Sequence, residues 1–287
     1  MPVQRVCDTN IFYDVSAALF DPAKLRPAGE QLAITPVSIL EIASKVSPDN
    51  FAQRKAAARA ALDLGAVVLP DPEMHLATIW NVPAKIETVP WRDGLIAIAD
   101  SSSAEQLERG VDDVQNRVRR TVRVPIAHAW RSFHYADFMD QVIVAVDQYV
   151  PGYAKKRAKG EMKQANAETR KKLRVAFGGP AALLEVLLAT RDRALLVGDI
   201  RQPPKAAVAE IQKAVEQLII YISVYARYFE KVATTFAPQE NDWGDLECFL
   251  YLQGDRQVVT AEDRWLDIAT ELGCDHLLVD TKPLKTA

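Results

Sequence analysis

The chain has 287 residues, of which 49% are hydrophobic and 25% charged, and its formal net charge is −3. This length is enough for one large domain or two ordinary ones, and so small a net charge favours no class of partner. No stretch has the roughly eighteen apolar residues of a membrane span, and the start lacks the apolar segment of a signal peptide. Cys7, Cys248 and Cys274 are too few and too scattered for a disulfide framework or a zinc site. We therefore expect a cytoplasmic protein that does not enter a membrane, with its cysteines in the core.

The first 75 residues alternate between short apolar runs and amphipathic or alanine-rich segments. Three strands are predicted, at residues 3–7, 32–34 and 66–69. Thr35-Pro36 is typical of a helix start, because a hydroxyl caps the first turn and proline is tolerated at its first position. A basic helix at 53–64 is predicted to end at Gly65. This alternation indicates βαβ units and a parallel sheet.

Residues 238–287 return to the same pattern, whereas residues 76–237 differ from it. The end of the chain predicts helices at 243–252 and 264–272, with strands at 257–259 and 276–279. In the middle the strand signals fade, and helices are predicted at 134–149, 181–189 and 206–236. Neither end alone has enough strands for a stable sheet. We therefore predict an α/β core, with a parallel sheet of about five strands flanked by helices, that is formed by residues 1–75 and 238–287 around a large all-helical insertion at 76–237.

Four carboxylates occupy matching places in this pattern. Asp8 follows the first strand, Glu41 lies on the helix after the second, Asp245 begins the helix after the insertion, and Asp263 follows the strand at 257–259. Because the carboxyl ends of parallel strands line one crevice, we expect these four side chains to converge there.

Converging carboxylates repel one another, and buried like charges either take up protons or recruit a cation. Oxygen ligands of this kind suit Mg²⁺ or Mn²⁺, and such an ion suits phosphodiester hydrolysis because it activates water and stabilises the leaving oxygen. Three of these acids, and the nearby Asp242, also have an ordinary alternative. Asp8, Asp242 and Asp263 fit helix caps, and Glu41 fits a solvent-facing helix position. Their order on matching elements is what favours a site.

Four segments resemble the motifs of the PIN-domain nuclease family. They are VCDTNIF at 6–12, TPVSILEI at 35–42, Asp245 with its surroundings, and VVTAED at 258–263. The resemblance implies a parallel α/β fold, metal-dependent cleavage of RNA, and Asp8, Glu41, Asp245 and Asp263 as catalytic metal ligands. It also implies Asn10 and Thr260 as supporting polar groups. The chain departs from the family's compact toxins in its long insertion. Asp242, one helical turn before Asp245, is the alternative third acid, and Asp245 is preferred because its distance to Thr260 fits the motif better.

Two stretches of the insertion are rich in basic residues and have few acidic ones. We interpret them as nucleic-acid contacts, since phosphate contacts dominate the affinity for nucleic acids. The candidate residues are Arg117, Arg119, Arg120, Arg123, Lys155, Lys156, Arg157, Lys171 and Lys172. The alternative is a solvated helical face or a mobile loop.

The expected activity is an Mg²⁺- or Mn²⁺-dependent endoribonuclease. Three alternatives stay open: a nuclease acting on DNA flaps or junctions, a non-catalytic module that recruits a protein partner, and a toxin held by a cognate antitoxin. Members of the family often form dimers, so a homodimer is a further expectation. The long helix predicted at 206–236 suits a dimer interface as well as an internal bundle.

Overall fold

The computed structural model describes residues 4–27, 29–85, 90–121, 143–144, 146–164, 167–198, 200, 205–236, 239 and 242–284, apart from the side chains of residues 111, 114–121, 163, 164 and 284. Five parallel strands form one sheet in the order β3-β2-β1-β4-β5. They are β1 (Gln4–Cys7), β2 (Gln31–Ile34), β3 (Val67–Val68), β4 (Gln257–Thr260) and β5 (Leu278–Asp280). The predicted parallel α/β sheet is thus confirmed.

The strand order reverses between β1 and β4. From β1 the chain continues outward to β2 and β3, and from β4 it continues in the other direction to β5. Val6 pairs with Val258 and Cys7 with Val259, so the two strands end at the same edge of the sheet. A reversal of this kind opens a crevice outside the carboxyl ends of the strands, which is where ligands bind in open α/β sheets.

The first part of the chain places its helices on one face of the sheet. These helices are α1 (Thr9–Ser16), α2 (Pro22–Leu25), α3 (Pro36–Ala43) and α4 (Phe51–Asp63). As predicted, α3 begins at Thr35-Pro36, where Ser38 N donates to Thr35 Oγ1 at 3.0 Å. The turn after α4 uses Gly65, whose φ of +65° is in the left-handed region that favours glycine.

Between β3 and β4, every regular element of the described residues is helical. They are α5 (Pro72–Ile79), α6 (Trp91–Asp100), α7 (Ala104–Thr121), α10 (Tyr153–Ala158), α11 (Ala167–Gly178), α12 (Pro180–Val197), α13 (Val208–Thr234) and α14 (Asp242–Cys248), with 3₁₀ turns at Glu161–Gln164 and Phe249–Tyr251. After β4 come α15 (Asp263–Leu272) and 3₁₀ turns at Asp275–Leu277 and Lys282–Leu284. Most of the predicted helix at 134–149 lies outside the described residues.

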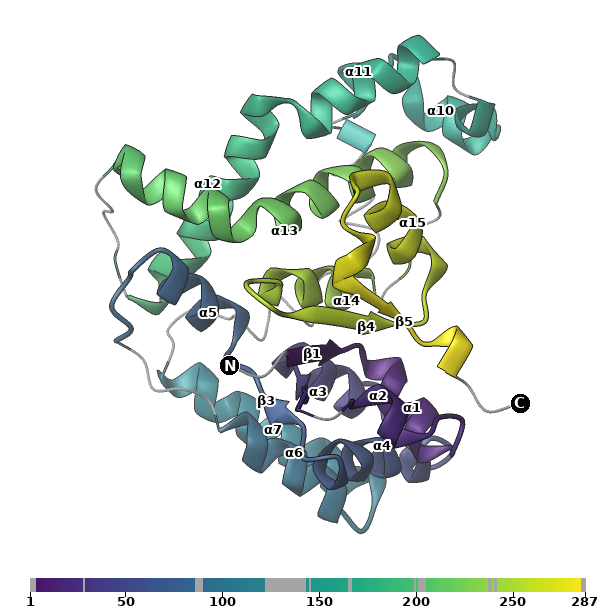
Figure 1. Cartoon of the computed structure of the whole chain (residues 1–287), viewed down its shortest axis with the longest axis vertical. Helices are drawn as coiled ribbons and strands as arrows, with labels where there is room; N and C mark the ends of the chain where they lie inside the picture. Colours follow the sequence, from purple (N-terminus) through teal and green to yellow (C-terminus); the bar gives the residue numbers. More distant parts are fainter. Residues whose placement is uncertain are drawn as a thin grey trace.

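Each face of the sheet has its own hydrophobic core, because successive side chains of a strand point to opposite faces. Val6 and Val258 belong to a core shared with α5 and α10–α15. Their neighbours Cys7 and Val259 belong to a core shared with α1–α4, α6 and α7. Figure 1 shows the first group of helices above the sheet and the second below it.

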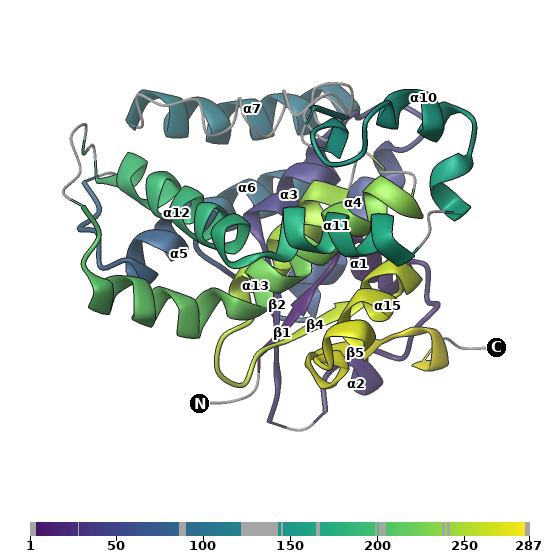
Figure 2. The same ribbon diagram turned by 90° about the horizontal axis from the view of Figure 1, so that it is seen from above.

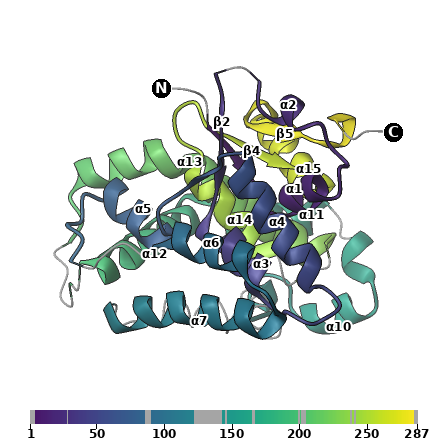
Figure 3. The same cartoon turned by 90° about the horizontal axis from the view of Figure 1, so that it is seen from below.

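The helices between β3 and β4 therefore cover both faces of the sheet. Seen from above, α13 and α11 lie on the side of the strands that faces the viewer (Figure 2), and seen from below, α6 lies beside α4 and α7 lies beside α6 (Figure 3). The apolar side chains of these helices share their cores with the strands. In the described residues, the helices between β3 and β4 therefore belong to the same packed domain as the sheet.

Helix α12 combines a packed face with exposed apolar side chains. By length and composition alone, the stretch Ala167–Val197 could cross a membrane, with a mean hydropathy of 1.5 in its most apolar window and 17% of that window buried. On the packed face, Trp80 Nε1 donates to the buried Thr190 Oγ1 at 3.0 Å.

The three cysteines are free and buried, as the sequence predicted.

Candidate metal centre

Asp8 is the first residue after β1 and lies at the point where the strand order reverses. Its backbone N donates to Val259 O at 3.1 Å, which holds it against the end of β4. Its side chain caps α1, accepting from Asn10 N at 3.4 Å and from Asn10 Nδ2 at 3.5 Å. Asp8 is buried, so it is both the helix cap and the site residue that the sequence suggested as alternatives.

Asp245 reaches the same point from α14. Its side chain is buried, and the indole Nε1 of Trp265 donates to Asp245 Oδ2 at 3.1 Å. Trp265 lies on α15 and is itself buried, so its hydrogen bond fixes the carboxylate inside the protein. The preference for Asp245 over Asp242 agrees with this placement.

The third carboxylate of the group is Glu262, and the expectation that Asp263 belongs there is wrong. Glu262 lies two residues beyond the end of β4, in extended backbone conformation at the N-cap of α15. Its carboxylate lies close to those of Asp8 and Asp245. Asp263, one position on, has a side chain that is 79% exposed and pairs with Lys282.

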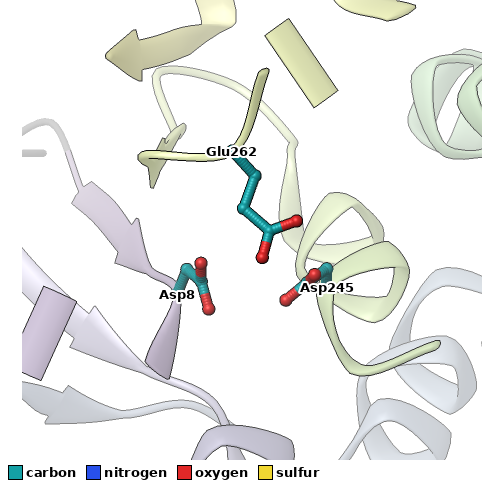
Figure 4. A group of neighbouring side chains, drawn as sticks. All are labelled: Asp8, Asp245 and Glu262. Atoms are coloured by element: carbon teal, nitrogen blue, oxygen red, sulfur yellow. The ribbon is translucent and has the colours of Figure 1, made fainter. Parts of the chain in front are cut away.

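Asp8, Asp245 and Glu262 point toward one another from three different elements (Figure 4). Each offers a carboxylate oxygen, and these three oxygens all lie within 4.8 Å of one another. The strand reversal accounts for part of this geometry, because β1 and β4 pair side by side and end at the same edge. In the described residues this is the one group of at least three potential ligands so close together.

Glu41 lies beside the group on α3 and is not one of its three members. Its Oε2 accepts a hydrogen bond from Thr9 Oγ1. Its Oε1 lies against Gly244, where an added Cβ would overlap the carboxylate. Because Gly244 has no side chain, α14 can approach Glu41 closely at the residue just before Asp245.

Burial raises the pKa values of all four acids, and repulsion within the group adds to the rise for Asp8, Glu41 and Asp245. Burial, with the nearby Glu262, raises the pKa of Asp8 to about 6. Burial also raises the pKa of Glu41 to about 8, and Asp8 adds to the rise. The pKa of Asp245 is raised well above its ordinary value by burial and then by Asp8 and Glu41. Burial raises the pKa of Glu262 as well, although the adjacent Arg264 opposes the rise. The group therefore favours either protons or a bound cation.

The supporting residues behave differently from one another. Asn10 contacts Asp8 as described above, and Thr260 Oγ1 accepts from Glu262 N at 3.1 Å. Both contacts agree with the expected supporting positions. Asp242 is buried but its carboxylate faces Tyr228 and Arg264, away from the three-acid group. Three residues along a helix leave side chains about 60° apart, enough here to separate Asp242 from Asp245.

The basic residues are only partly described. The side chains of Arg117, Arg119 and Arg120, and the whole of Arg123, lie outside the described residues. Lys155 and Lys171 are exposed, Lys156 is half-buried, and Lys172 pairs with Glu168 at 3.1 Å.

Arg157 does not fit a nucleic-acid contact. Its guanidinium bonds to Val232 O, to Phe236 O at 3.2 Å and to Tyr153 Oη at 3.1 Å. These carbonyls end α13, so Arg157 caps that helix, where a cation also complements the helix dipole. The prediction for this residue is wrong because its neighbours along the sequence do not reveal the long-range carbonyls that it meets.

The donor chemistry of the group fits a hard divalent cation. All four acids offer oxygen, three of them have an oxygen within 4.8 Å of the other two, and Asp8 and Asp245 are buried. Comparisons of the chain with models of protein families, with curated proteins and with solved structures find no match. The residues of the site therefore carry the functional argument, together with the motifs that resemble the PIN-domain family.

Proposed function

We propose that the chain is a metal-dependent nuclease that hydrolyses phosphodiester bonds, with RNA as its substrate. The observation that carries the proposal is the convergence of Asp8, Asp245 and Glu262 at the strand reversal. RNA is chosen because the four motifs resemble those of a family that usually cleaves it. The fourth motif contributes Glu262 in place of Asp263.

In this proposal the acids share the work of holding an Mg²⁺ or Mn²⁺ ion. A bound ion of this kind lowers the pKa of water and stabilises the leaving oxygen of a phosphodiester. Asp8, Asp245 and Glu262 would hold the ion, because their oxygens already face one another. Asn10 orients Asp8, and Thr260 fixes the backbone of Glu262.

Glu41 has a separate part in the proposal. Its raised pKa of about 8 means that its carboxyl holds a proton at neutral pH in the metal-free protein. The hydroxyl of Thr9 orients this carboxyl, and Gly244 brings it to the edge of the three-acid group. Glu41 is therefore the acid placed to exchange a proton with the site.

The substrate would need basic contacts outside the acidic centre. Among the candidate basic residues that the structure describes, Lys155 and Lys171 are exposed and suit contacts with phosphate, whereas the exposed Lys172 pairs with Glu168. Neutralising both is expected to weaken RNA binding and to reduce its dependence on salt concentration.

Calorimetric titration with Mn²⁺, combined with cleavage of a mixed RNA pool and a matching DNA pool, tests the function. The wild type is compared with Asp8→Asn/Glu262→Gln, and Asp263→Asn is the matched control because its carboxylate lies outside the group. We expect the wild type and the control to bind Mn²⁺ and cleave RNA, and the double variant to do neither.

Other results have definite meanings. Preferential cleavage of DNA would replace RNA as the substrate. Mn²⁺ binding without cleavage would favour a non-catalytic binding module. The absence of Mn²⁺ binding by the wild type would refute the metal site altogether.

A further inference from the structure

A line of polar side chains connects α13 to the acidic group. It begins at Tyr228, whose hydroxyl donates to Asp242 Oδ2 at 2.6 Å. The same oxygen accepts from Gln239 N at 2.8 Å. Asp242 is only 3% exposed, so its carboxylate is fixed by these donors inside the protein. Its second oxygen, Oδ1, faces Arg264.

Arg264 continues the line from Asp242 to Glu262. Its Nη1 donates to Asp242 Oδ1, and its Nε lies 3.0 Å from Glu262 Oε2. The Arg264 side chain is 16% exposed. The contact with Glu262 is an ion pair and not a hydrogen bond, since Oε2 is buried without a hydrogen-bond partner in the described residues. Because Asp242 binds the planar guanidinium, Arg264 presents its positive charge to Glu262 from a fixed place.

We infer that Arg264 is a positioning residue that fixes the carboxylate of Glu262 for a divalent ion, and that Asp242 and Tyr228 hold Arg264 in place. This inference rests on the proposed metal-dependent function. It gives Asp242 a part in the site as the support of Arg264, and it links α13 to the centre.

The physical reason is the flexibility of glutamate. A long side chain on a loop loses rotamer freedom when it binds an ion, and that loss weakens binding unless the side chain is ordered beforehand. Arg264 restrains Glu262 through its ion pair with Oε2. Partners of metal-bound carboxylates act in this way, and removing such a partner reduces metal affinity by about 10- to 100-fold.

Arg264 also brings a positive charge, which by itself repels a cation. The two effects have opposite signs, so they can be separated. Arg264→Lys keeps the charge and loses the planar guanidinium, and one ammonium cannot hold two carboxylates in the same fixed geometry. If positioning dominates, this variant binds metal more weakly. If charge alone matters, its affinity does not change.

The test measures Mn²⁺ affinity by calorimetry on the full chain, with thermal unfolding in EDTA as a separate readout of folding. The variants are Arg264→Lys and Tyr228→Phe, which removes only the hydroxyl that holds Asp242. Lys282→Ala is the matched control, because it removes a nearby cation whose partner Asp263 is exposed. We expect Arg264→Lys to lose about 10- to 100-fold in affinity, Tyr228→Phe to lose less, and Lys282→Ala to bind as the wild type does.

A folded Arg264→Lys protein that binds Mn²⁺ within about twofold of the wild type, or more tightly, overturns the inference while the proposed function stands. If Arg264→Lys does not fold, Tyr228→Phe decides the matter by the same measurement, because unchanged affinity in that variant also overturns the inference. A wild type that does not bind Mn²⁺ removes both the function and the inference.

Discussion

Replacing Asp8 with asparagine should stabilise the metal-free protein, although the same change removes a metal ligand. The carboxylate is buried beside other acids, so its ionised form is disfavoured and its pKa is raised from 3.8 to about 6. Asparagine keeps the shape and the capping ability of aspartate, since both are good N-caps. The substitution therefore removes the charge while keeping the start of α1.

The rise in pKa sets both the sign and the size of the effect. Between pH 3.8 and about 6 the folded protein retains a proton that the unfolded chain has released, so the stability falls as the pH rises through this window. Above it, the ionised Asp8 costs about 3 kcal/mol. We expect Asp8→Asn to gain about 3 kcal/mol near pH 8 and about half of that near pH 5.

Urea unfolding followed by circular dichroism, in EDTA and at both pH values, measures these free energies. Near pH 8, Mn²⁺ at about 1,000 times its Kd should reverse the order, because it stabilises the wild type by about 4.1 kcal/mol and the variant lacks a ligand. Asp263→Asn, with its exposed side chain, should change stability by less than about 0.5 kcal/mol. If Asp8→Asn is less stable than the wild type near pH 8 in EDTA, the assignment of Asp8 to a repulsive acidic group is wrong.

Three further substitutions test the surroundings of the site by urea unfolding. Trp265→Phe removes the donor to Asp245, and we expect a loss of about 1–3 kcal/mol together with weaker Mn²⁺ binding. Arg193→Met leaves two buried glutamates without their cation, and should cost about 3–5 kcal/mol at neutral pH. Gly244→Ala should destabilise by about 1–3 kcal/mol, because the new methyl group overlaps the carboxylate of Glu41. In a helix without that contact, the same change would stabilise by about 0.5–1 kcal/mol, so its sign is diagnostic.

The acids of the site were largely predictable, because strand ends and helix starts are visible in the sequence. Asp8 and Asp245 were placed correctly on that basis. The motif predicts Asp263, whereas the structure brings Glu262 beside Asp8 and Asp245. Because Glu262 lies beyond the last residue of β4, at the N-cap of α15, the alternation within the strand does not decide which of the two acids faces the others.

Contacts between distant elements were less predictable. The pattern of α13 shows that one face is buried but not which element covers it, so the pairing of Tyr228 with Asp242 could not be foreseen. The same limit applies to Arg193 of α12, whose guanidinium binds Glu247 of α14 through two hydrogen bonds of 2.8 Å. A charged residue in an apolar helix indicates a partner, but the sequence does not name it.

These distant contacts explain how a short helix can carry a precise site. The seven residues of α14 form too short a helix to be stable alone, so its position depends on its neighbours. Tyr228 of α13 binds Asp242 at its start, Trp265 of α15 binds Asp245 in its middle, and Arg193 of α12 binds Glu247 near its end. The helices α12, α13 and α15 each bind one of the three acids of α14. Loosening any of these three helices should therefore move Asp245. Metal affinity and the packing of the helices between β3 and β4 should therefore change together, since an ion that binds only the ordered site also stabilises that packing.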